Sequence, residues 1–420
     1  MSFGIALSGL NAAQSDLNVT ANNIANSQTT GFKSSDSQFS ELFAVSPQGV
    51  SKTQIGEGVA LTQVKQNFAQ GNIETSGNSL DMALSGNGFF TVSASGVDQY
   101  TRAGSFQTDK NGFVVNSEGQ NLQVYAPNAN GGFLTTQLTN LQIPTGDSPP
   151  SATTSAALVF NLPAGSAVPS ATPFSPANSA SYNQSTSLTE YDSLGAAHTA
   201  SMYFVAAGVA ANGTSTWDAY EYIDGTQVNA TPVKLSYTSG GALAGVLDTA
   251  GGTNTTAASF GAYTPATGAA AMNITFNFSG TTQYGDAFGV TKVTQNGFTT
   301  GQISGVSVSS TGVVQANYTN GQAVALGQVA VANFASQEDL QQVNDTNWVQ
   351  TASSGAPVYG QAGGAGVGLI QSGSLEQSNV DITAQLVNMI TAQRAFQANS
   401  EMVSTENVIT QTVINIPNQQ

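Results

Sequence analysis

The chain has 420 residues, no cysteine, and a net charge of −16 from 24 acidic and 8 basic residues. The absence of cysteine excludes disulfides and thiol chemistry, and the shortage of Lys and Arg argues against nucleic-acid binding, which needs clustered cations. Only 8% of the residues are charged, so Ser, Thr, Asn, Gln and Gly must form most of the surface, which suits an inert surface outside the cell.

The first segment predicts an amphipathic helix over residues 1–26. Apolar side chains recur every seven residues, a spacing typical of a helix that buries a narrow seam, at Phe3, Leu10, Leu17 and Ile24, with a second row at Ala6 and Ala13. The segment lacks the basic start and uninterrupted apolar core of a secretory signal. No stretch of 18 apolar residues exists anywhere in the chain, so no membrane-spanning helix is expected.

Residues 27–70 form a connector that is neither clearly helical nor clearly disordered. From Gly71 the apolar period changes to two, and the dipeptides Asn87-Gly88 and Asn111-Gly112 are typical of hairpin turns. Residues 71–147 are therefore predicted to form short antiparallel strands.

Seven prolines between residues 144 and 176 indicate a domain boundary. Strand-like runs follow at residues 188–191, 201–205, 217–222 and 274–278, and a third β section begins near residue 293. That section contains the turns Asn296-Gly297 and Asn320-Gly321 and a buried-strand candidate at residues 329–332. Because strands occur on both sides of the middle region, we expect residues 71–147 and 294–359 to form one β domain, with residues 148–293 inserted as another.

After a second connector at residues 360–379, the sequence predicts a helix from Ile382 to about Ile414. Ser378 and Asp381 fit a capping box at its start. Its apolar seam repeats the seven-residue spacing at Ile382, Met389, Phe396 and Val403, with Leu386 and Ile390 widening the stripe. At about 1.5 Å per residue this helix is about 50 Å long, too long for the first helix to cover, so we expect its free face to contact other subunits. On the pattern alone, an ordinary intramolecular hairpin of the two helices is equally compatible.

The predicted fold is therefore α+β with several domains. The N- and C-terminal helices, in residues 1–26 and 380–420, form a coiled-coil-like core, and two nested, mainly antiparallel β domains lie between them in the sequence.

No catalytic arrangement emerges from the sequence. The glycines at residues 364–368 do not have dinucleotide-binding spacing, and Glu338 and Asp339 would point to opposite faces of a strand. His198, the only histidine, has no nucleophile-elbow sequence nearby. We expect no catalytic, cofactor or metal site, and hence no enzyme.

Motifs at both ends resemble those of the bacterial flagellar axial proteins, the family of rod, hook and hook–filament junction subunits. The first comprises Asn23-Ile24-Ala25-Asn26 and Thr30-Gly31-Phe32-Lys33. The second comprises residues 375–381, with Asn379 and Asp381, and residues 389–399, with Gln393 and Arg394. Residues 100–106 are similar to a segment shared by rod and hook subunits, whereas residues 189–198 and 327–334 look like the hook branch.

This resemblance implies a structural subunit of the flagellar hook, a curved and flexible tube that couples the rod to the filament and transmits torque as a universal joint. The terminal seams would then be assembly contacts. The implied partners are other copies of the chain, the rod subunit, the hook cap, the hook–filament junction proteins and the flagellar export apparatus. The implied location is the extracellular hook of the flagellum basal body, reached without a cleaved signal peptide.

Two alternatives remain open on the sequence. One is the distal rod subunit, which resembles this chain at both ends but lacks a second β insertion. The other is a secreted β-rich surface protein or carbohydrate-active enzyme whose helices merely close the fold.

Overall fold

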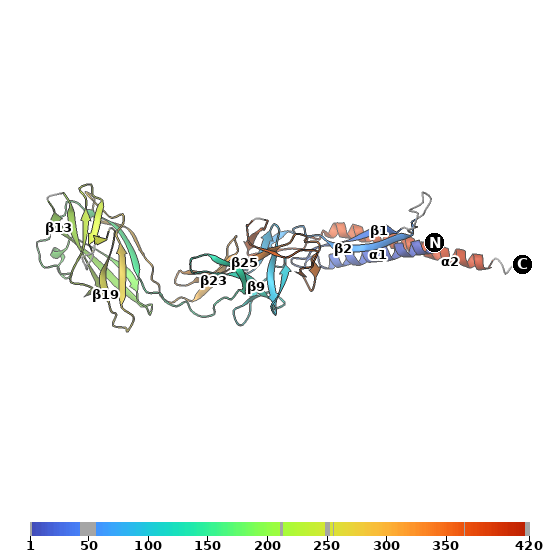
Figure 1. Cartoon of the computed structure of the whole chain (residues 1–420), viewed down its shortest axis with the longest axis horizontal. Coiled ribbons are helices and arrows are strands. Elements are labelled where there is room, and N and C mark those ends of the chain that lie inside the picture. The colour runs from blue at the N-terminus through green and yellow to red at the C-terminus, as the bar shows by residue number, and fades with distance from the viewer. Residues whose placement is uncertain are drawn as a thin grey trace. The chain divides into compact units, whose positions relative to one another are not determined.

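The computed structural model describes residues 2–42, 56–210, 213–247, 253–254, 256–364 and 366–415, and the chain divides into two compact units (Figure 1). Unit 1 comprises residues 1–145, 304–317 and 323–420, and unit 2 comprises residues 146–303 and 318–322. Both ends of the chain thus belong to unit 1, and the sequence of unit 2 interrupts it.

Two helices, α1 (Ser2–Ala25) and α2 (Ile382–Asn415), pack against each other in unit 1 (Figure 1). Asp381 caps α2, because its Oδ1 accepts hydrogen bonds from the backbone N of Thr383 at 2.8 Å and of Ala384 at 3.2 Å. The predicted capping box is wrong. Ser378 lies three residues too early, and its hydroxyl accepts instead from Val380 N at 3.3 Å.

A β-hairpin of β1 (Ser35–Leu42) and β2 (Gly58–Gln66) lies beside α1 (Figure 1). The Ser8 hydroxyl joins the two elements, accepting from Val59 N at 3.2 Å and donating to Ile5 O at 2.8 Å. The first predicted connector, which had no clear secondary structure in the sequence, therefore contains two strands.

The β part of unit 1 combines segments that precede unit 2 in the sequence with segments that follow it. Its main sheet contains, in order, β23 (Ile303–Val308), β24 (Val313–Tyr318), β25 (Ala323–Asn333), β9 (Asn121–Pro127), β5 (Phe89–Ala94), β6 (Val97–Thr101), β27 (Asn347–Val349) and β26 (Gln341–Gln342). Attached to it are β7 (Gln107–Thr108), β8 (Val114–Val115), β10 (Phe133–Asn140) and β28 (Val358–Gln361). Two small sheets pair β4 (Met82–Ser85) with β29 (Leu369–Ser372) and β3 (Ile73–Thr75) with β30 (Ser374–Glu376).

The centre of the main sheet is β25, which pairs with both β9 and β5. The predicted buried strand at residues 329–332 is confirmed, since these four side chains are fully buried within β25. The Asn320-Gly321 turn is also confirmed, because it joins the paired strands β24 and β25 and Gly321 has φ +80°.

The predicted turn Asn296-Gly297 joins no hairpin, because the strand before it, β22 (Gly289–Gln295), pairs with β11 (Ser155–Pro163), and β23 pairs with β24. The other two predicted Asn-Gly turns have different outcomes. Asn111-Gly112 does lie in a hairpin loop, between β7 and β8. Asn87-Gly88 does not, because β4 pairs with β29 while β5 pairs with β6, β9 and β25. A Cβ at residue 88 would lie 2.6 Å from Val331 Cγ1, so Gly88 serves the close approach of β25 rather than a tight turn.

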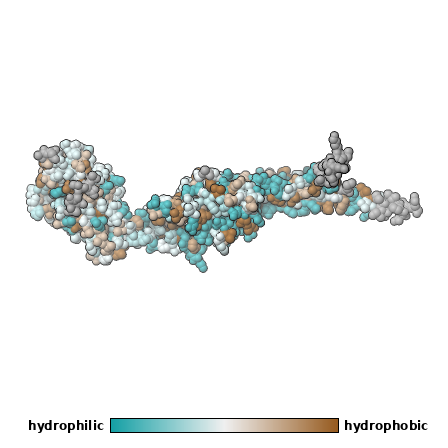
Figure 2. Space-filling model, viewed as in Figure 1, coloured by the Kyte–Doolittle hydropathy of each residue, from teal (hydrophilic) through white to brown (hydrophobic). Residues whose placement is uncertain are grey.

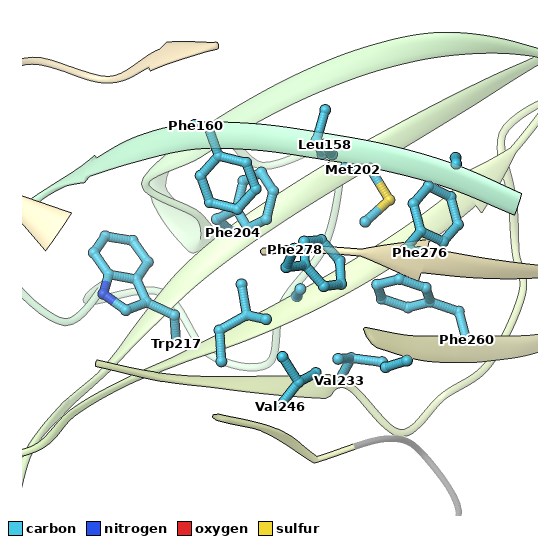
Figure 3. Close-up of a cluster of buried hydrophobic side chains, with 14 of the residues drawn as sticks. Leu158, Phe160, Met202, Phe204, Trp217, Val233, Val246, Phe260, Phe276 and Phe278 are labelled. Atoms are coloured by element: carbon cyan, nitrogen blue, oxygen red, sulfur yellow. The ribbon is translucent and has the colours of Figure 1, made fainter. Parts of the chain in front are cut away.

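Unit 2 is a sandwich of two sheets around one apolar core (Figure 3). One sheet contains β12 (Gln184–Tyr191), β13 (Ala197–Val209), β14 (Ser215–Ile223), β15 (Thr226–Gln227), β16 (Val233–Tyr237), β17 (Leu243–Leu247) and β18 (Thr253–Asn254). The other contains β19 (Ala257–Tyr263), β20 (Met272–Asn277), β11 (Ser155–Pro163), β21 (Thr282–Tyr284) and β22 (Gly289–Gln295). A short 3₁₀ helix, η1 (Ser179–Ser181), precedes β12.

The strands of unit 2 alternate between buried and accessible side chains, as expected where each sheet covers one face of a core. Phe160 of β11 and Phe204 of β13 meet across the core with ring centroids 4.5 Å apart (Figure 3). The strand-like runs predicted at residues 188–191, 201–205, 217–222 and 274–278 are confirmed by β12, β13, β14 and β20.

Candidate functional site

The terminal helices pack through small side chains. Ala6 and Ala13 of α1 and Ala392 of α2 are buried. Gly9 of α1 lies so close to α2 that an added Cβ would come within 2.7 Å of the Asn399 amide oxygen. Small residues thus let the two backbones approach closely along the seam.

The two helices run antiparallel. Asn23 Nδ2 of α1 donates to Gln385 Oε1 of α2 at 3.2 Å, while Gly9 contacts Asn399 at the opposite end of α1. In both pairs the two residue numbers add up to 408, so Ser2 lies level with about residue 406. The last two turns of α2 therefore extend beyond α1, and Val408 and Ile409 there are 59% and 52% exposed.

The predicted seam residues fall into two groups. The partly buried ones are Leu10, Leu17, Ile24, Met389, Phe396 and Val403. The exposed ones are Phe3, Ile382 and Leu386, with 44%, 46% and 47% of the residue surface accessible. Ile382, Leu386 and Ile390 form a row of residues four apart on α2. Leu386 and Ile390 each follow a seam residue by one position and so lie about 100° around the helix from it, while Ile382 lies beyond the end of α1, which is level with about residue 383. The helix α1 therefore leaves this row uncovered.

The motif after α1 fixes the exit of the helix. Asn23 is buried and holds the start of β1 at both backbone atoms, since Nδ2 donates to Ser35 O at 2.8 Å and Oδ1 accepts from Ser35 N at 2.9 Å. Asn26 Oδ1 accepts from the Thr29 hydroxyl at 3.1 Å. These bonds bend the chain back, so that the hairpin lies along the helix from which it emerges.

Gly31 is required by a close contact. Its φ is +71°, and an added Cβ would lie 2.5 Å from Ala103 N. Its own N–H donates to Glu376 O at 2.8 Å, and the next side chain, Phe32, is buried. The N-terminal motif is therefore packed against segments about 70 and 340 residues further along the chain.

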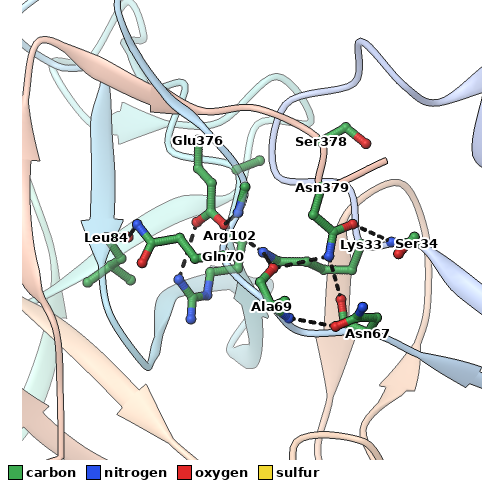
Figure 4. Close-up of polar contacts among 12 residues, drawn as sticks. Lys33, Ser34, Asn67, Ala69, Gln70, Leu84, Arg102, Glu376, Ser378 and Asn379 are labelled. Atoms are coloured by element: carbon green, nitrogen blue, oxygen red, sulfur yellow. Dashed lines mark hydrogen bonds and ion pairs between the residues drawn. The ribbon is translucent and has the colours of Figure 1, made fainter. Parts of the chain in front are cut away.

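A buried ion triad lies where these segments meet (Figure 4). The Glu376 carboxylate contacts Lys33 Nζ through Oε1 at 2.5 Å and Arg102 Nη1 through Oε2 at 3.2 Å. All three residues are at most 1% exposed. Lys33 Nζ also donates to Ala69 O at 2.9 Å, and Gly71 N donates to Glu376 Oε1 at 2.9 Å.

Burial lowers the pKa of Lys33 and of Arg102, although the attraction of Glu376 opposes the shift in both. Arg102 also lies 5.3 Å from the centre of the Phe89 ring, which gives its guanidinium a second favourable contact. The triad links the exit of α1, the strand end after β6 and the strand β30, which precedes α2.

Asn379 supplements the triad with backbone contacts (Figure 4). Its Oδ1 accepts from Ser34 N at 2.7 Å, and its Nδ2 donates to Asn67 O at 2.7 Å and Ala69 O at 3.1 Å. One side chain thus holds both ends of the β1–β2 hairpin beside the start of α2, which Asp381 caps.

The remaining motif residues lie on α2 or line a cavity. Gln393 and Arg394 are both exposed on α2. Arg394 is two residues from Ala392 and from Phe396 and therefore about 200° around the helix from each, whereas Gln393 is about 100° from Ala392. Asn26, Thr30 and Phe32 line a polar cavity of about 550 Å³. Brown and teal side chains alternate over the helices and hairpin (Figure 2), so apolar groups remain accessible there among polar ones.

Sequence reasoning placed Glu376 and Arg102 within motifs but did not include them among the site residues. The scarcity of charge could have identified them. In a chain with eight basic residues, a Lys and an Arg inside two separate motifs are unusual, and a buried cation requires a carboxylate.

Four family profiles match successive parts of the chain. They are the flagella basal body rod protein (residues 3–33), the flagellar hook protein FlgE/F/G D1 domain (83–157), the flagellar basal body protein FlaE D2 domain (161–298) and the flagellar basal body rod FlgEFG protein C-terminal (371–416). The flagellar hook protein FlgE of Escherichia coli is 37% identical over 99% of this chain and 100% of its own length. The chain belongs to the flagellar hook protein family.

Hook proteins of other bacteria are also similar to this chain. FlgE of Salmonella typhimurium is 36% identical over 99% of this chain and 100% of its own length, and FlgE of Brucella suis is 33% identical over 98% of this chain and 97% of its own. The crystal structure of Helicobacter pylori flagellar hook protein FlgE2 has the same fold, with a TM-score of 0.53 and 13% identity over 72% of this chain and 100% of that one.

Membership of the hook protein family confirms the predicted fold class and function. The chain is a structural subunit of the flagellar hook and part of the flagellum, and it is not an enzyme. The carbohydrate-active alternative is therefore wrong, and the hook proteins matched over their full length favour the hook over the distal rod. Among the residues that the structure describes, no helix is both long and apolar enough to span a bilayer.

Replacing Glu376 with Ala should destabilise unit 1 by about 3–5 kcal/mol, because Lys33 and Arg102 would remain buried without a counter-charge. The measurement is urea unfolding followed by the fluorescence of Trp348, which is buried in unit 1, with Trp217 replaced by Phe. The matched control is Glu338→Ala, which removes an exposed ion pair with Lys65 and should cost about 0–1 kcal/mol. Equal costs for the two variants would contradict the role assigned to the triad.

Proposed function

We propose that this subunit polymerises through its terminal helices into a curved, flexible tube that couples the rod to the filament and transmits torque. The observation that carries the proposal is the uncovered apolar row Ile382, Leu386 and Ile390 on α2, together with the turns of α2 that extend beyond α1. Apolar rows that one partner helix leaves exposed are typical of helices that pack against further helices.

We further propose a layered arrangement of the tube. The terminal helices, within residues 1–26 and 380–420, form the innermost layer around an axial channel. The first β domain, at 71–147 and 294–359, lies next to it through the connectors 27–70 and 360–379, and the inserted domain at 148–293 lies outermost. Outer contacts between polar, weakly charged surfaces are individually weak, so they can slide while the inner helices hold. The face of unit 2 that is visible in Figure 2 is mostly pale, which means that its residues are of intermediate hydropathy, and this supports the assignment of weak contacts to it.

The partners that follow from this proposal are other copies of the chain, the rod subunit, the hook cap and the hook–filament junction proteins. The subunit would reach its extracellular position through the flagellar export apparatus without a cleaved signal peptide. Gln393 and Arg394 are exposed on α2, and we assign them to contacts with neighbouring subunits.

Replacing Ile390 with Asn should abolish polymerisation while leaving the monomer folded. Ile390 is 50% exposed, so the change removes apolar surface that only a neighbour would bury and should alter monomer stability by no more than about 0.5 kcal/mol. Electron microscopy of the purified protein is the measurement. The control is Val209→Asn on unit 2, where the residue is 70% exposed and tubes should still form. Normal tubes from the Ile390 variant would exclude this row as an interface.

Removing unit 2 should leave a polymer that assembles but is straight or mechanically altered. The structure suggests where to cut, because Ser151 and Phe298 exchange two backbone hydrogen bonds, of 3.0 and 2.9 Å. Deleting residues 152–297 and closing the gap with Asn-Gly therefore joins ends that already lie together. Curvature would be measured in electron micrographs of tubes from both proteins. Complete loss of assembly would show that unit 2 carries the main interface.

The terminal segments should be disordered in the free subunit and become helical on assembly. Half-exposed seam residues contribute only part of the roughly 1.5–3 kcal/mol available per fully buried large side chain, while ordering each backbone residue costs about 1–2 kcal/mol. Amide hydrogen exchange of monomer and polymer measures this difference directly. Strong protection of both ends in a sample shown to be monomeric would favour a stable intramolecular hairpin instead.

A further inference from the structure

Two glutamates lie inside the apolar core of unit 2. Glu190 of β12 and Glu221 of β14 are 0% and 3% exposed. Their neighbours on the same faces of these strands, Leu188 and Ile223, belong to the apolar cluster of the sandwich. Within the described part of the chain, both carboxyl oxygens of Glu190 lack a hydrogen-bond partner, and so does Oε1 of Glu221. An ionised carboxylate in such a place is costly, because burial removes its water and nothing replaces it.

The single histidine adjoins this pair. His198 of β13 stands opposite Glu190 in the strand register, and its imidazole lies between two aspartates. Nδ1 is 2.6 Å from Asp224 Oδ2, and Nε2 is 3.3 Å from Asp192 Oδ2. Asp192 Oδ1 also accepts from the backbone N of Leu194 and of Ala196, both at 2.9 Å, which fixes the turn between β12 and β13.

This turn contacts both segments through which the chain enters and leaves unit 2. An added Cβ on Gly195 would lie 2.8 Å from Pro150 Cβ and 3.4 Å from Thr299 Cα. At the end of β12, Tyr191 O accepts from Thr153 N at 2.8 Å, and Tyr191 N donates to Thr153 Oγ1 at 2.9 Å. We name the turn 192–195 with Pro150, Thr153 and Thr299 the clasp.

We propose that protons on Glu190 and Glu221 keep the clasp closed, so that unit 2 is fastened at its entry and exit segments in mildly acidic solution and loosens as the pH rises. Loss of the protons places two negative charges on β12 and β14, the strands on either side of β13. These strands must then separate enough to admit water or a cation, and β12 leads directly into the turn of the clasp.

The pKa values of Glu190, Glu221 and His198 are all raised in the folded protein. Burial raises the pKa of Glu190 to about 7, with His198 opposing, and burial together with Glu190 raises the pKa of Glu221 to about 9. Burial lowers the pKa of His198, but its bonds to Asp224 and Asp192 outweigh this and leave it raised. Each of the three groups therefore holds its proton more tightly in the folded state than in the unfolded state.

The sign of the effect follows from this difference. The stability contributed by the two glutamates is fully present below their ordinary value of 4.5 and is lost as the pH rises through about 7 and then about 9. The raised pKa of His198 adds a loss in the same direction. Asp192 and Asp224 have lowered pKa values, so their contribution is lost only in acid, below their ordinary value of 3.8. Tyr263 of β19 also faces the cluster, and its ring packs edge-on against His198.

The full-length protein tests the proposal, because each unit contains one tryptophan. Trp217 is buried in unit 2 and Trp348 in unit 1, so replacing Trp348 with Phe makes the fluorescence report on unit 2 alone. In urea titrations, the unfolding equilibrium constant of unit 2 should rise at least about tenfold between pH 6 and pH 9, which corresponds to one unit of pKa difference between the two states. The double variant Glu190→Gln, Glu221→Gln keeps the shape of the protonated side chains and should lose most of this rise.

Two further measurements sharpen the outcome. Asp286→Asn removes an exposed carboxylate from the same unit and should keep the full pH dependence. Hydrogen exchange at pH 9, corrected for intrinsic rates, should open peptides from residues 186–200 before the rest of unit 2, and the glutamine variant should protect them. Equal stability of the parent protein at pH 6 and pH 9, or an undiminished pH dependence in the double variant, would overturn the proposal. If the double variant does not fold, Glu190→Gln alone must reduce the dependence.

Discussion

The buried contact of Glu376 with Lys33 and Arg102 holds the helical and β parts of unit 1 together. A buried ion pair stabilises a fold no more than apolar side chains of the same volume would, but it tolerates few arrangements of its partners. Here the partners come from the exit of α1, the end of β6 and the strand before α2. The triad therefore fixes the direction in which both helices leave the β part of unit 1, and the hydrogen bonds of Asn379 keep the hairpin aligned with them.

The helix seam divides the apolar side chains of α2 between two uses. The inner row includes Ala392 and half-buried Met389 and Phe396, and it faces small residues of α1. Close packing against Ala6, Gly9 and Ala13 needs no large apolar residues from α1. The larger exposed residues of α2 are then free for the contacts with other chains that we propose. A subunit of a polymer requires this division, because a helix that buried all its apolar surface within one chain would have nothing left for its neighbours.

Unit 2 is built on a different principle. Its core is formed by interdigitated aromatic and aliphatic side chains from two sheets, and such a core depends on no contact with the helices. The exceptions are Glu190 and Glu221, which introduce titratable groups where apolar side chains would stabilise more. Because Glu190 lies beside the turn that contacts both connecting segments, we expect the base of the unit to be its part most sensitive to pH.

Local patterns in the sequence determined the secondary structure well. The seven-residue spacing gave both helices to within a few residues, and period-two alternation gave the strands around Trp217 and Phe276, because these periods reflect which side of an element is buried. The family motifs likewise pointed to the region where Gly31, Lys33 and Asn379 meet. These features depend on residues that are close together in the sequence, so they can be predicted from the sequence without the tertiary structure.

Only the tertiary structure decided which partner each residue meets. The dipeptide Asn87-Gly88 predicts a hairpin turn, yet β4 pairs with β29 and β5 pairs with β25, and Gly88 allows β25 to approach closely. Ile382 and Met389 share one row of the heptad pattern, but the antiparallel seam covers only Met389, because α1 ends at Ala25, level with about residue 383. Glu376 and Glu190 are both glutamates on strands, but the Glu376 carboxylate contacts two cations, while the carboxyl oxygens of Glu190 have no hydrogen-bond partner among the described residues. No local pattern distinguishes them, because the burial and charge around each side chain are supplied by segments distant in the sequence.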